Sequence, residues 1–389
     1  MYVGVDIGTT RIKAAAVSDR GILLDTSSVD ASSDMHRPGS DLRPLLETIE
    51  GLLKTIQAAH DPIRAIAVSA IAPSLVAFTR SGSIRTAFTH LTTSSIGPCR
   101  SANFDDRLGV SRIRSDERRT RYETQFGVPQ CYLPLSTAVG FLLTGQLGFD
   151  VMTAYELGFT SISSLTAWCG ADVLSDDPTR HRPLHLAATT TDSAASMLGC
   201  GAARASDVML YYGTYFCAAE IRCDLASVMK KDLIDEIPFL WLVSLPYYGP
   251  FLESEVRRLT GASTDAAFDE FGRALDRSAA TSLRLARALI SKHSGPFGFD
   301  EYTVSVEAAD EASTFDEHAA ILAAPLGFAL REAALRMTPE WSPRCYAAGG
   351  ASRINGLVRL TSRLSGIDQE MLPGAWTCIG SASLARRGP

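Results

Sequence analysis

The chain has 389 residues, of which 46% are hydrophobic, so it is long and apolar enough for two or three packed domains. These values exclude a disordered protein and a small disulfide scaffold. With 37 Lys and Arg against 43 Asp and Glu, the formal net charge is -6, which leaves no broad cationic surface for a nucleic acid. Five arginines between residues 112 and 121 follow helical spacing with acids among them, and we interpret them as a solvated helix face.

The sequence contains no uninterrupted run of 18 apolar residues and no secretory signal pattern, so we predict a cytoplasmic protein without a membrane span. Its eight cysteines are scattered without a C-x-x-C pair, which predicts reduced, mostly buried thiols. His181 and His185 are four residues apart, but Pro183 interrupts the helix that a zinc-binding pair of this spacing needs. We therefore expect no zinc site.

The N-terminal segment predicts an antiparallel meander of three strands. Apolar runs cover residues 2–7, 12–17 and 22–24, and turn residues separate them at 8–10 and 19–21. In the common glycine-rich nucleotide loops a strand leads into a helix, whereas the first glycine turn here joins two strands. Neither G-x-x-x-x-G-K-[ST] nor G-x-G-x-x-G occurs.

The rest of the first half predicts an α/β layer. An amphipathic helix is expected over residues 42–59 and an apolar strand over 65–69. A short, β-branched strand over 183–191 would deliver Asp192 at its C-terminal end, just before a helix-like segment over 193–198.

The second half opens as the first does, because a β-prone run over 208–212 leads through Gly213-Thr214 into another extended segment. Gly8-Thr9 and Gly213-Thr214 are 205 residues apart, which indicates a duplicated α/β architecture with one phosphate-binding hairpin in each half. We predict one domain over residues 1–195 and a second over 196–389, with a shared cleft. Further helices are predicted over 266–290, 316–337 and 356–364, and a strand over 345–348 that leads into Gly349-Gly350.

The first turn groups residues that suit phosphate chemistry. Asp6 ends a buried strand, and Gly8, Thr9, Thr10 and Lys13 follow it closely. A carboxylate can hold the waters of a hydrated Mg²⁺, the N–H groups and hydroxyls of a turn can contact phosphate oxygens, and a cation can offset developing charge. The alternative is an ordinary β-hairpin with an acid near its turn.

The sequence resembles the FGGY carbohydrate kinases, of the sugar kinase, actin and Hsp70 superfamily, in four places that follow the family's order. Residues 3–10 with Lys13 are similar to the first phosphate motif, and most of all to its xylulokinase version. The other matches are Leu142-Leu143-Thr144-Gly145 with Trp168; Thr191-Asp192-Ser193-Ala194-Ala195 with Gly199, Gly201 and Gly213-Thr214; and Ala348-Gly349-Gly350-Ala351-Ser352 with Gly380-Ser381-Ala382.

The resemblance implies two actin-like, ribonuclease H-like α/β domains with an interdomain cleft, and ATP-dependent phosphorylation of a hydroxyl on a small sugar or polyol. Asp192 would be the general base, with a helix N-cap as the alternative role. Asp6 would organise Mg²⁺. Thr9, Thr10 and Thr214 would approach the phosphates beside Gly8 and Gly213.

The resemblance also gives an adenosine site. Gly349 and Gly350 would let the adenine ring lie against bare backbone, although a turn after a strand is the alternative. Lys13 is either a phosphate contact or a solvent-facing strand residue. The expected cofactors are ATP and Mg²⁺, and the expected partner is a small sugar or polyol, with no nucleic acid and no membrane. A homodimer stays open.

The sequence departs from the family on the acceptor side. The sugar-contacting tryptophan-x-aspartate-x-arginine motif has no clear counterpart over residues 89–95, a glycine-rich substrate segment is reduced to 295–300, and the segment before Asp192 is short. We therefore keep two hypotheses: a carbohydrate kinase, or a nucleotide-binding regulatory protein with a degenerate acceptor pocket. An ATPase activator of a dehydratase would need clustered cysteines for an iron–sulfur centre, and the scattered cysteines argue against it.

Overall fold

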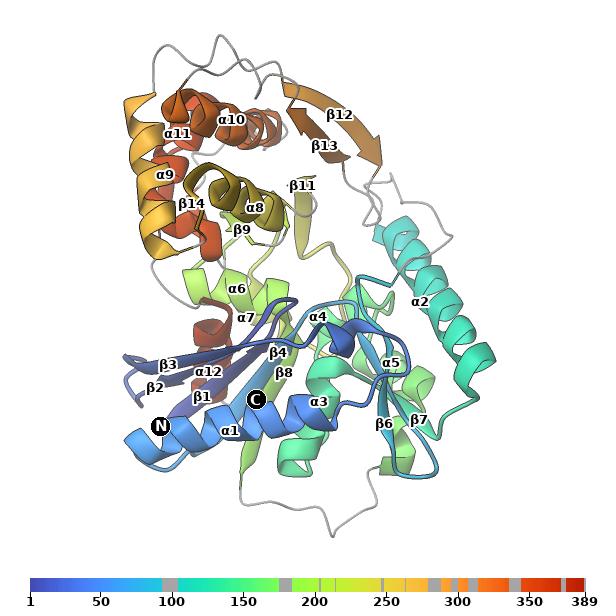
Figure 1. The fold of residues 1–389 in the computed structure, drawn as a ribbon. Helices are drawn as coiled ribbons and strands as arrows, with labels where there is room; N and C mark the ends of the chain where they lie inside the picture. Colours follow the sequence, from blue (N-terminus) through green and yellow to red (C-terminus); the bar gives the residue numbers. More distant parts are fainter. Residues whose placement is uncertain are drawn as a thin grey trace. The chain divides into compact units, whose positions relative to one another are not determined.

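The computed structural model describes residues 1–92, 104–174, 184–202, 204–213, 215–245, 248–262, 264–278, 288–294, 300–306, 314–335, 344–371 and 376–387. The chain forms two compact α/β units (Figure 1). The first unit contains Met1–Gly201, Leu225–Ile237 and Ala375–Pro389, and the second contains Ala202–Asp224 and Pro238–Gly374. These units differ from a continuous division at residue 195, because the C-terminal helix belongs to the first unit.

A five-stranded sheet forms the centre of the first unit, in the order β3-β2-β1-β4-β8. The predicted meander is confirmed, since β1 and β3 both pair antiparallel with β2. β4 and β8 extend the sheet parallel to β1, so the C-terminal ends of these three strands lie at one edge. The strands are β1 (Tyr2–Ile7), β2 (Arg11–Val17), β3 (Leu23–Asp30), β4 (Ala65–Ala70) and β8 (His185–Thr191).

Side-chain alternation along β1 separates the two faces of this sheet. Val3, Val5 and Ile7 join the main core, to which helix α1 (Arg43–Ala59) contributes its buried side chains. Gly4 and Asp6 alternate with them and therefore face the other side. There α12 (Trp376–Arg387) packs so closely that a Cβ on Gly4 would lie 2.0 Å from the carbonyl oxygen of Cys378.

Two glycines let α6 (Asp192–Cys200) and α12 touch backbone to backbone. A Cβ on Gly199 would lie 1.9 Å from the carbonyl oxygen of Trp376, and a Cβ on Gly380 would lie 1.9 Å from that of Ala195. Real side chains do not reach such distances, so only glycine fits at either position. The contact holds the helix that begins with Asp192 against the element that covers the β1 face.

The first unit also contains a small sheet with the strand order β6-β5-β7. Its strands are β5 (Leu75–Phe78), β6 (Ile84–Phe88) and β7 (Cys131–Pro134), and the other helices are α2 (Phe104–Phe126), α3 (Leu135–Thr144), α4 (Val151–Glu156), α5 (Ile162–Cys169), α7 (Leu225–Val228) and the short 3-10 turns η1 (Ser33–His36) and η2 (Ala171–Leu174).

The interpretation of the α2 arginines as a solvated face is wrong in part. Arg114 and Arg118 are only 8% and 5% exposed. The Arg112 guanidinium lies 4.3 Å from the centre of the Phe159 ring, and Arg119 lies 5.1 Å from that of Trp168. The arginines are covered because α2 packs its basic side chains against aromatic rings instead of turning them all to water.

The second unit contains a seven-stranded sheet in the order β12-β13-β11-β10-β9-β14-β15. The strands are β9 (Val208–Tyr212), β10 (Phe216–Ile221), β11 (Phe239–Leu245), β12 (Ala288–Ser294), β13 (Asp300–Val306), β14 (Cys345–Ala348) and β15 (Gln369–Met371). The helices are α8 (Tyr248–Thr260), α9 (Asp265–Arg277), α10 (Phe315–Ala334), α11 (Asn355–Ser365) and the 3-10 turn η6 (Gly350–Arg353). The predicted second hairpin is confirmed, because β9 and β10 pair antiparallel on either side of Gly213.

The helix predicted over residues 266–290 is wrong in its C-terminal part. α9 ends at Arg277, residues 279–287 lie outside the described part, and β12 begins at Ala288. The segment that starts at Ala288 pairs antiparallel with β13 over its whole length, so sheet pairing overrides its weak helical pattern. The predicted helices near 316–337 and 356–364 are confirmed as α10 and α11.

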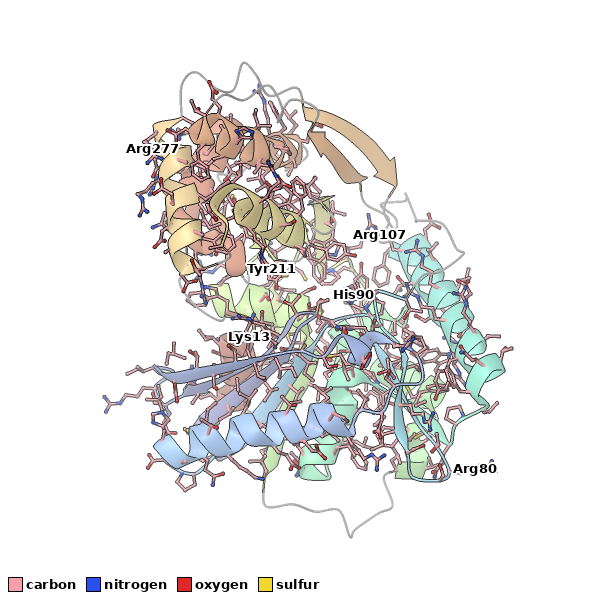
Figure 2. All side chains as sticks on the ribbon, viewed as in Figure 1. Lys13, Arg80, His90, Arg107, Tyr211 and Arg277 are labelled. Carbon is pink, nitrogen blue, oxygen red and sulfur yellow. The ribbon has the colours of Figure 1, made fainter. Side chains whose placement is uncertain are left out.

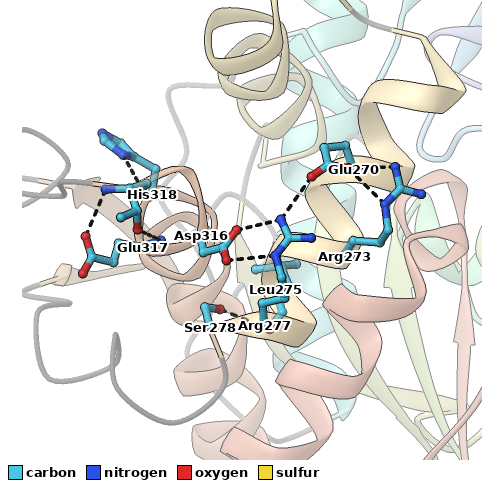
Figure 3. A network of polar contacts seen from close by, with 9 residues as sticks. Glu270, Arg273, Leu275, Arg277, Ser278, Asp316, Glu317 and His318 are labelled. Carbon is cyan, nitrogen blue, oxygen red and sulfur yellow. Dashed lines mark hydrogen bonds and ion pairs between the residues drawn. The ribbon is translucent and has the colours of Figure 1, made fainter.

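A surface network joins α9 to the start of α10 in the second unit (Figure 3). Arg277 donates from Nε and Nη2 to the two carboxylate oxygens of Asp316 at 2.9 and 2.8 Å, and from Nη2 to Glu270 at 3.0 Å. Thr314 and Glu317 form a capping box at the N-terminus of α10. The ion pairs are exposed and so add little to stability, whereas the buried faces of both helices form part of the core beneath them.

The seven cysteines of the described part are all buried free thiols, as the sequence predicts, while Cys99 lies outside it. None of the described helices has both the length and the apolar character that a bilayer crossing requires.

Candidate active site

The parallel strands of the first unit bring several polar residues to one edge of the sheet. In the register, Asp6 of β1 lies between Lys13 of β2 and Ser69 of β4. Thr191, the last residue of β8, pairs with Ala70 at the end of β4, and Asp192 follows it directly. Ligands of α/β folds commonly bind at the carboxyl ends of parallel strands, so this edge is the candidate active site.

Asp6 is a buried carboxyl with two compensating contacts. It is 3% exposed, and its Oδ1 accepts a hydrogen bond of 3.3 Å from the Ser69 hydroxyl. Lys13 projects from β2 (Figure 2), and its Nζ lies 3.8 Å from Oδ2 of Asp6. Burial raises the pKa of Asp6, and Lys13 and Ser69 act in the opposite direction. The predicted grouping of Asp6 with Lys13 is therefore present.

The carbonyl groups of the hairpin after β1 accept the hydrogen bonds that hold it in place. Gly8 donates its N–H to the Arg11 carbonyl at 3.0 Å, and a Cβ on Gly8 would lie 2.9 Å from that same oxygen. The Thr9 carbonyl accepts from Nε2 of His36 at 3.0 Å, and the Thr10 carbonyl accepts from the N–H of Ala31, just after β3, at 2.9 Å. Within the described residues, the N–H groups and hydroxyls of both threonines have no hydrogen-bond partner. They are free to donate to an anion.

Asp192 is the first residue of α6 and is half-buried. Its alternative role as the N-cap is wrong, because Thr191 caps the helix by accepting from the N–H of Ala194 at 3.2 Å. Oδ1 of Asp192 accepts from the N–H of Ser193 at 2.9 Å, and Oδ2 has no hydrogen bond within the part of the chain that the structure describes. Burial and the negative charge of Asp6 raise the pKa of Asp192 to about 7.

Two further carboxyls beside Asp192 were not singled out by sequence reasoning. Asp150 caps α4 by accepting from the N–H groups of Met152 and Thr153, and it also accepts from the Thr190 hydroxyl at 3.3 Å. Glu156 ends α4, where burial, followed by the charges of Asp192 and Asp150, raises its pKa to about 8.

A signal for these two acids exists in the sequence. They are the only charged residues between Glu123 and Asp172, and an isolated charge in an apolar segment indicates a buried or functional group.

A narrow pocket opens next to these carboxyls within the first unit. It is lined by residues 70–74 at the end of β4 and after it, residues 134–136 at the junction of β7 and α3, Thr153, Glu156 and Leu157 of α4 and its C-terminal end, and Thr190-Thr191 of β8. Its free space matches one water-sized group. Among the described lining residues only Glu156 is charged. Ser74 also lines the pocket, is 5% exposed, and has a hydroxyl without a hydrogen-bond partner.

In the second unit, the glycine residues of the predicted nucleotide site lie at one sheet edge. β9 and β14 are parallel, so Gly213 after β9 and Gly349-Gly350 after β14 share that edge. Gly349 has φ +105°, and a Cβ there would lie 2.5 Å from the carbonyl oxygen of Tyr212. A side chain is excluded at Gly349 because the Tyr212 backbone fills that position, whereas a Cβ on Gly350 would meet nothing within 4 Å. Thr214 lies outside the described residues.

The site suits a hydrated Mg²⁺ better than a metal bound wholly by protein. No group of three or more His, Cys, Asp or Glu side chains that could hold a metal occurs within the described part of the chain. A Mg²⁺ ion that keeps most of its waters needs only one or two carboxylates. Asp6 and Asp192 influence each other electrostatically, and within the described residues Lys13 is the one cation that pairs with either of them, so the two carboxyls fit this requirement.

No protein-family model and no curated protein matches this sequence. Solved structures do match its fold. Xylulose kinase from Rhodospirillum rubrum is 17% identical with a TM-score of 0.62, over 99% of this chain and 89% of that one. Ligand-bound xylulose kinase from Lactobacillus acidophilus is 14% identical with a TM-score of 0.66, over 99% and 88%. Plasmodium falciparum glycerol kinase with ADP is 12% identical with a TM-score of 0.62, over 98% and 88%. The chain therefore has the two-domain α/β fold of the sugar and polyol kinases.

Proposed function

We propose that this protein transfers the terminal phosphoryl group of ATP to a hydroxyl of a small sugar or polyol, with Asp192 as the general base. The observation that carries the proposal is the position of Asp192. It begins a helix at the carboxyl end of the parallel strands, it is not used as the helix cap, and its pKa is about 7. A base with a pKa near the operating pH combines ionisation with a useful driving force for proton transfer.

The acceptor hydroxyl would bind beside Thr190-Thr191, so that Oδ2 of Asp192 can accept its proton. General-base catalysis of this kind typically contributes ~10²–10⁴-fold in rate. Most of the remaining acceleration in phosphoryl transfer comes from positioning and from stabilising charge, not from covalent chemistry. Asp192 suits this need for positioning, because its helix α6 is held against α12 by close contacts at two glycines.

The hairpin after β1 is our proposed site for the phosphate groups. The free N–H groups and hydroxyls of Thr9 and Thr10 would donate to phosphate oxygens, and Gly8 permits the tight turn that presents them. Asp6 would accept hydrogen bonds from waters of Mg²⁺, and Lys13 would offset negative charge. Magnesium, when bound with ATP, supplies neutralisation of the phosphate charge.

Gly213, Thr214, Gly349 and Gly350 are our proposed nucleotide contacts in the second unit. The open space beside Gly350 supports this proposal for an adenine ring, because nothing lies within 4 Å of where its Cβ would be and the backbone is bare there. The matching structure of a glycerol kinase with ADP supports ATP as the phosphoryl donor. A cytoplasmic location, where ATP is available, and a homodimer remain part of the proposal.

An ADP-release assay with Mg-ATP tests the function. The panel contains pentuloses, hexuloses, linear polyols and cyclitols, each with a no-acceptor blank. We expect at least one acceptor to raise ADP release well above the blank and to yield a phosphorylated product. The absence of turnover with every member of the panel, by a protein that binds Mg-ATP, would contradict kinase activity.

The small free space of the pocket favours one alternative, a nucleotide-binding regulatory protein on the same fold. A thermal-shift comparison separates the two functions. Stabilisation by Mg-ATP alone, with no further shift from any polyol, supports the regulatory protein, whereas an additional shift from an acceptor supports the kinase.

A further inference from the structure

The pocket beside Asp192 is lined by a carboxyl group that has no compensating partner in the described part of the chain. Glu156 is the one charged group among its described lining residues, and the structure gives Glu156 neither a hydrogen bond nor an ion pair within the described part of the chain. The other carboxyls that act on it are Asp192, at the start of α6, and Asp150, at the cap of α4. A carboxyl group in such surroundings lacks the compensation that buried acids normally have.

A second observation points to a ligand in this pocket. Ser74 is more than nine-tenths buried, lines the pocket, and has a hydroxyl without a hydrogen-bond partner. Buried hydroxyls are nearly always hydrogen-bonded, so an unpaired one on a pocket wall indicates a polar group that the protein meets on binding. A ligand group the size of a water molecule could therefore form hydrogen bonds with both a carboxyl group and a hydroxyl in this pocket.

We propose that the acceptor carries a primary ammonium group and that Glu156 binds this group in the pocket, which makes the substrate an amino-substituted polyol. The inference rests on the proposed kinase function and adds the chemical class of its acceptor. Glu156 and the Ser74 hydroxyl would both accept hydrogen bonds from the ammonium group, which has three donors and no acceptor.

Size and charge together favour an ammonium over the other substituents of a polyol. An ammonium group is close to a water molecule in size, so it fits the free space of the pocket. A carboxylate would be repelled by Glu156, Asp192 and Asp150 together. A hydroxyl could fit, but it would leave the charge of Glu156 unpaired, and charge-assisted hydrogen bonds are about twice as strong as neutral ones.

Loss of the Glu156 proton links this recognition to pH. The raised pKa of Glu156, about 8, means that a proton must leave before the ion pair forms at neutral pH. Ammonium binding should therefore strengthen between pH 6 and pH 8.5. Asp192, Asp150 and the adjacent Tyr155 are the other titratable groups coupled to Glu156. Thr190-Thr191 of β8, Ser136 of α3 and Ser74 carry no charge there.

Two matched sets of compounds test the proposal by calorimetry on the full chain at pH 8.5. One set is 3-amino-1,2-propanediol, glycerol and glycerate, and the other is 1-amino-1-deoxysorbitol, sorbitol and gluconate. Within a set only one substituent changes from amine to hydroxyl to carboxylate. We expect the amine of at least one set to bind roughly tenfold or more tightly than its neutral counterpart, with the carboxylate weakest.

The variant Glu156→Gln keeps the size of the side chain and removes its charge, so the preference for the amine should fall to about equal affinity. Glu47→Gln makes the same change at an exposed position of α1 and should keep the preference. Binding of Mg-ADP, followed in parallel, shows that Glu156→Gln is folded. The pH series on the unmodified protein gives a second readout that needs no variant.

The inference is overturned if the neutral or acidic compound binds as well as the amine, if no compound of either set binds, or if Glu156→Gln retains the preference. The same compounds are then assayed for ADP release. Turnover of neutral polyols without an amine preference leaves the kinase function in place and removes only the inference. Amine binding without any turnover supports the recognition by Glu156 and contradicts the kinase.

Discussion

Replacing Asp192 by Asn removes the base while keeping the shape of the side chain. Because general-base catalysis contributes ~10²–10⁴-fold, we expect kcat with the best acceptor of the panel to fall by that factor, or about 3–5 kcal/mol in activation free energy. Nucleotide affinity should change little, since the free donors of the hairpin belong to Thr9 and Thr10. The assay is coupled ADP release, with calorimetry for Mg-ADP binding.

Ionisation of Asp192 should affect activity and stability in opposite directions as the pH rises, and Asp192→Asn should remove both effects. For the unmodified enzyme, kcat/KM should rise as Asp192 ionises near its pKa of about 7 and then level off, and Asp192→Asn should lose this rise. In stability the sign is reversed. The folded protein holds the Asp192 proton more tightly than the unfolded chain does, so its contribution to stability is lost as pH rises from about 4 to about 7.

Asp192→Asn should therefore be more stable than the unmodified protein at pH 8, and the difference should vanish near pH 4. A carboxyl pKa of about 7 against an ordinary value of about 3.9 sets an upper limit of about 4 kcal/mol. Solvent screening of the half-buried group lowers this figure. Urea unfolding at both pH values measures the effect, and Asp61→Asn, at an exposed position, is the matched control.

The reasoning is refuted if Asp192→Asn keeps full activity with an unchanged pH profile, because another group must then accept the proton. An equal loss of stability at pH 4 and pH 8 would contradict the electrostatic account of this residue, even if activity were lost.

Substitutions at three further positions, two of them with a control variant, test the packing, the helix cap and the hairpin. Gly199→Ala should destabilise the protein by about 3 kcal/mol or more, because its Cβ would meet the Trp376 carbonyl. Gly51→Ala, in open space on α1, should stabilise it by about 0.5–1 kcal/mol. Equal changes in the free energy of unfolding of the two variants, measured with denaturant, would contradict the close helix contact. Thr191→Ala should cost about 1 kcal/mol and Thr191→Ser nearly nothing, and equal losses would mean that the hydroxyl does not cap α6. Gly8→Ala should weaken Mg-ATP binding by roughly tenfold, about 1.4 kcal/mol, and an unchanged affinity in calorimetry would remove the hairpin from the phosphate site.

Local patterns in the sequence predict much of the fold. The apolar runs that form β1 and β2, and the amphipathic segment that forms α1, carry their own periodicity, so the meander and the first helix are recognisable without the structure. Asp6 and Asp192 are recognisable because Asp6 lies near the end of an apolar strand and Asp192 directly follows one, each within a motif. The paired hairpins of the two units also follow from a repeated sequence pattern.

Features that depend on distant contacts could not be predicted in this way. The role of Glu156 depends on α4 lying beside β8, and sequence spacing contains no information on that contact. Arg118 has the spacing of a surface residue but is buried where α2 packs on the rest of its unit. The association of α12 with the first unit depends on glycine contacts between residues far apart in the chain. Tertiary packing decided each case.

The most direct measurement is the identification of the product by mass spectrometry after incubation with Mg-ATP and the amino and neutral polyols. The account predicts that an acceptor gains one phosphoryl group in step with the ADP formed, and that Asp192→Asn forms this product far more slowly. Formation of ADP and inorganic phosphate without a phosphorylated acceptor, or no consumption of ATP at all, would contradict it.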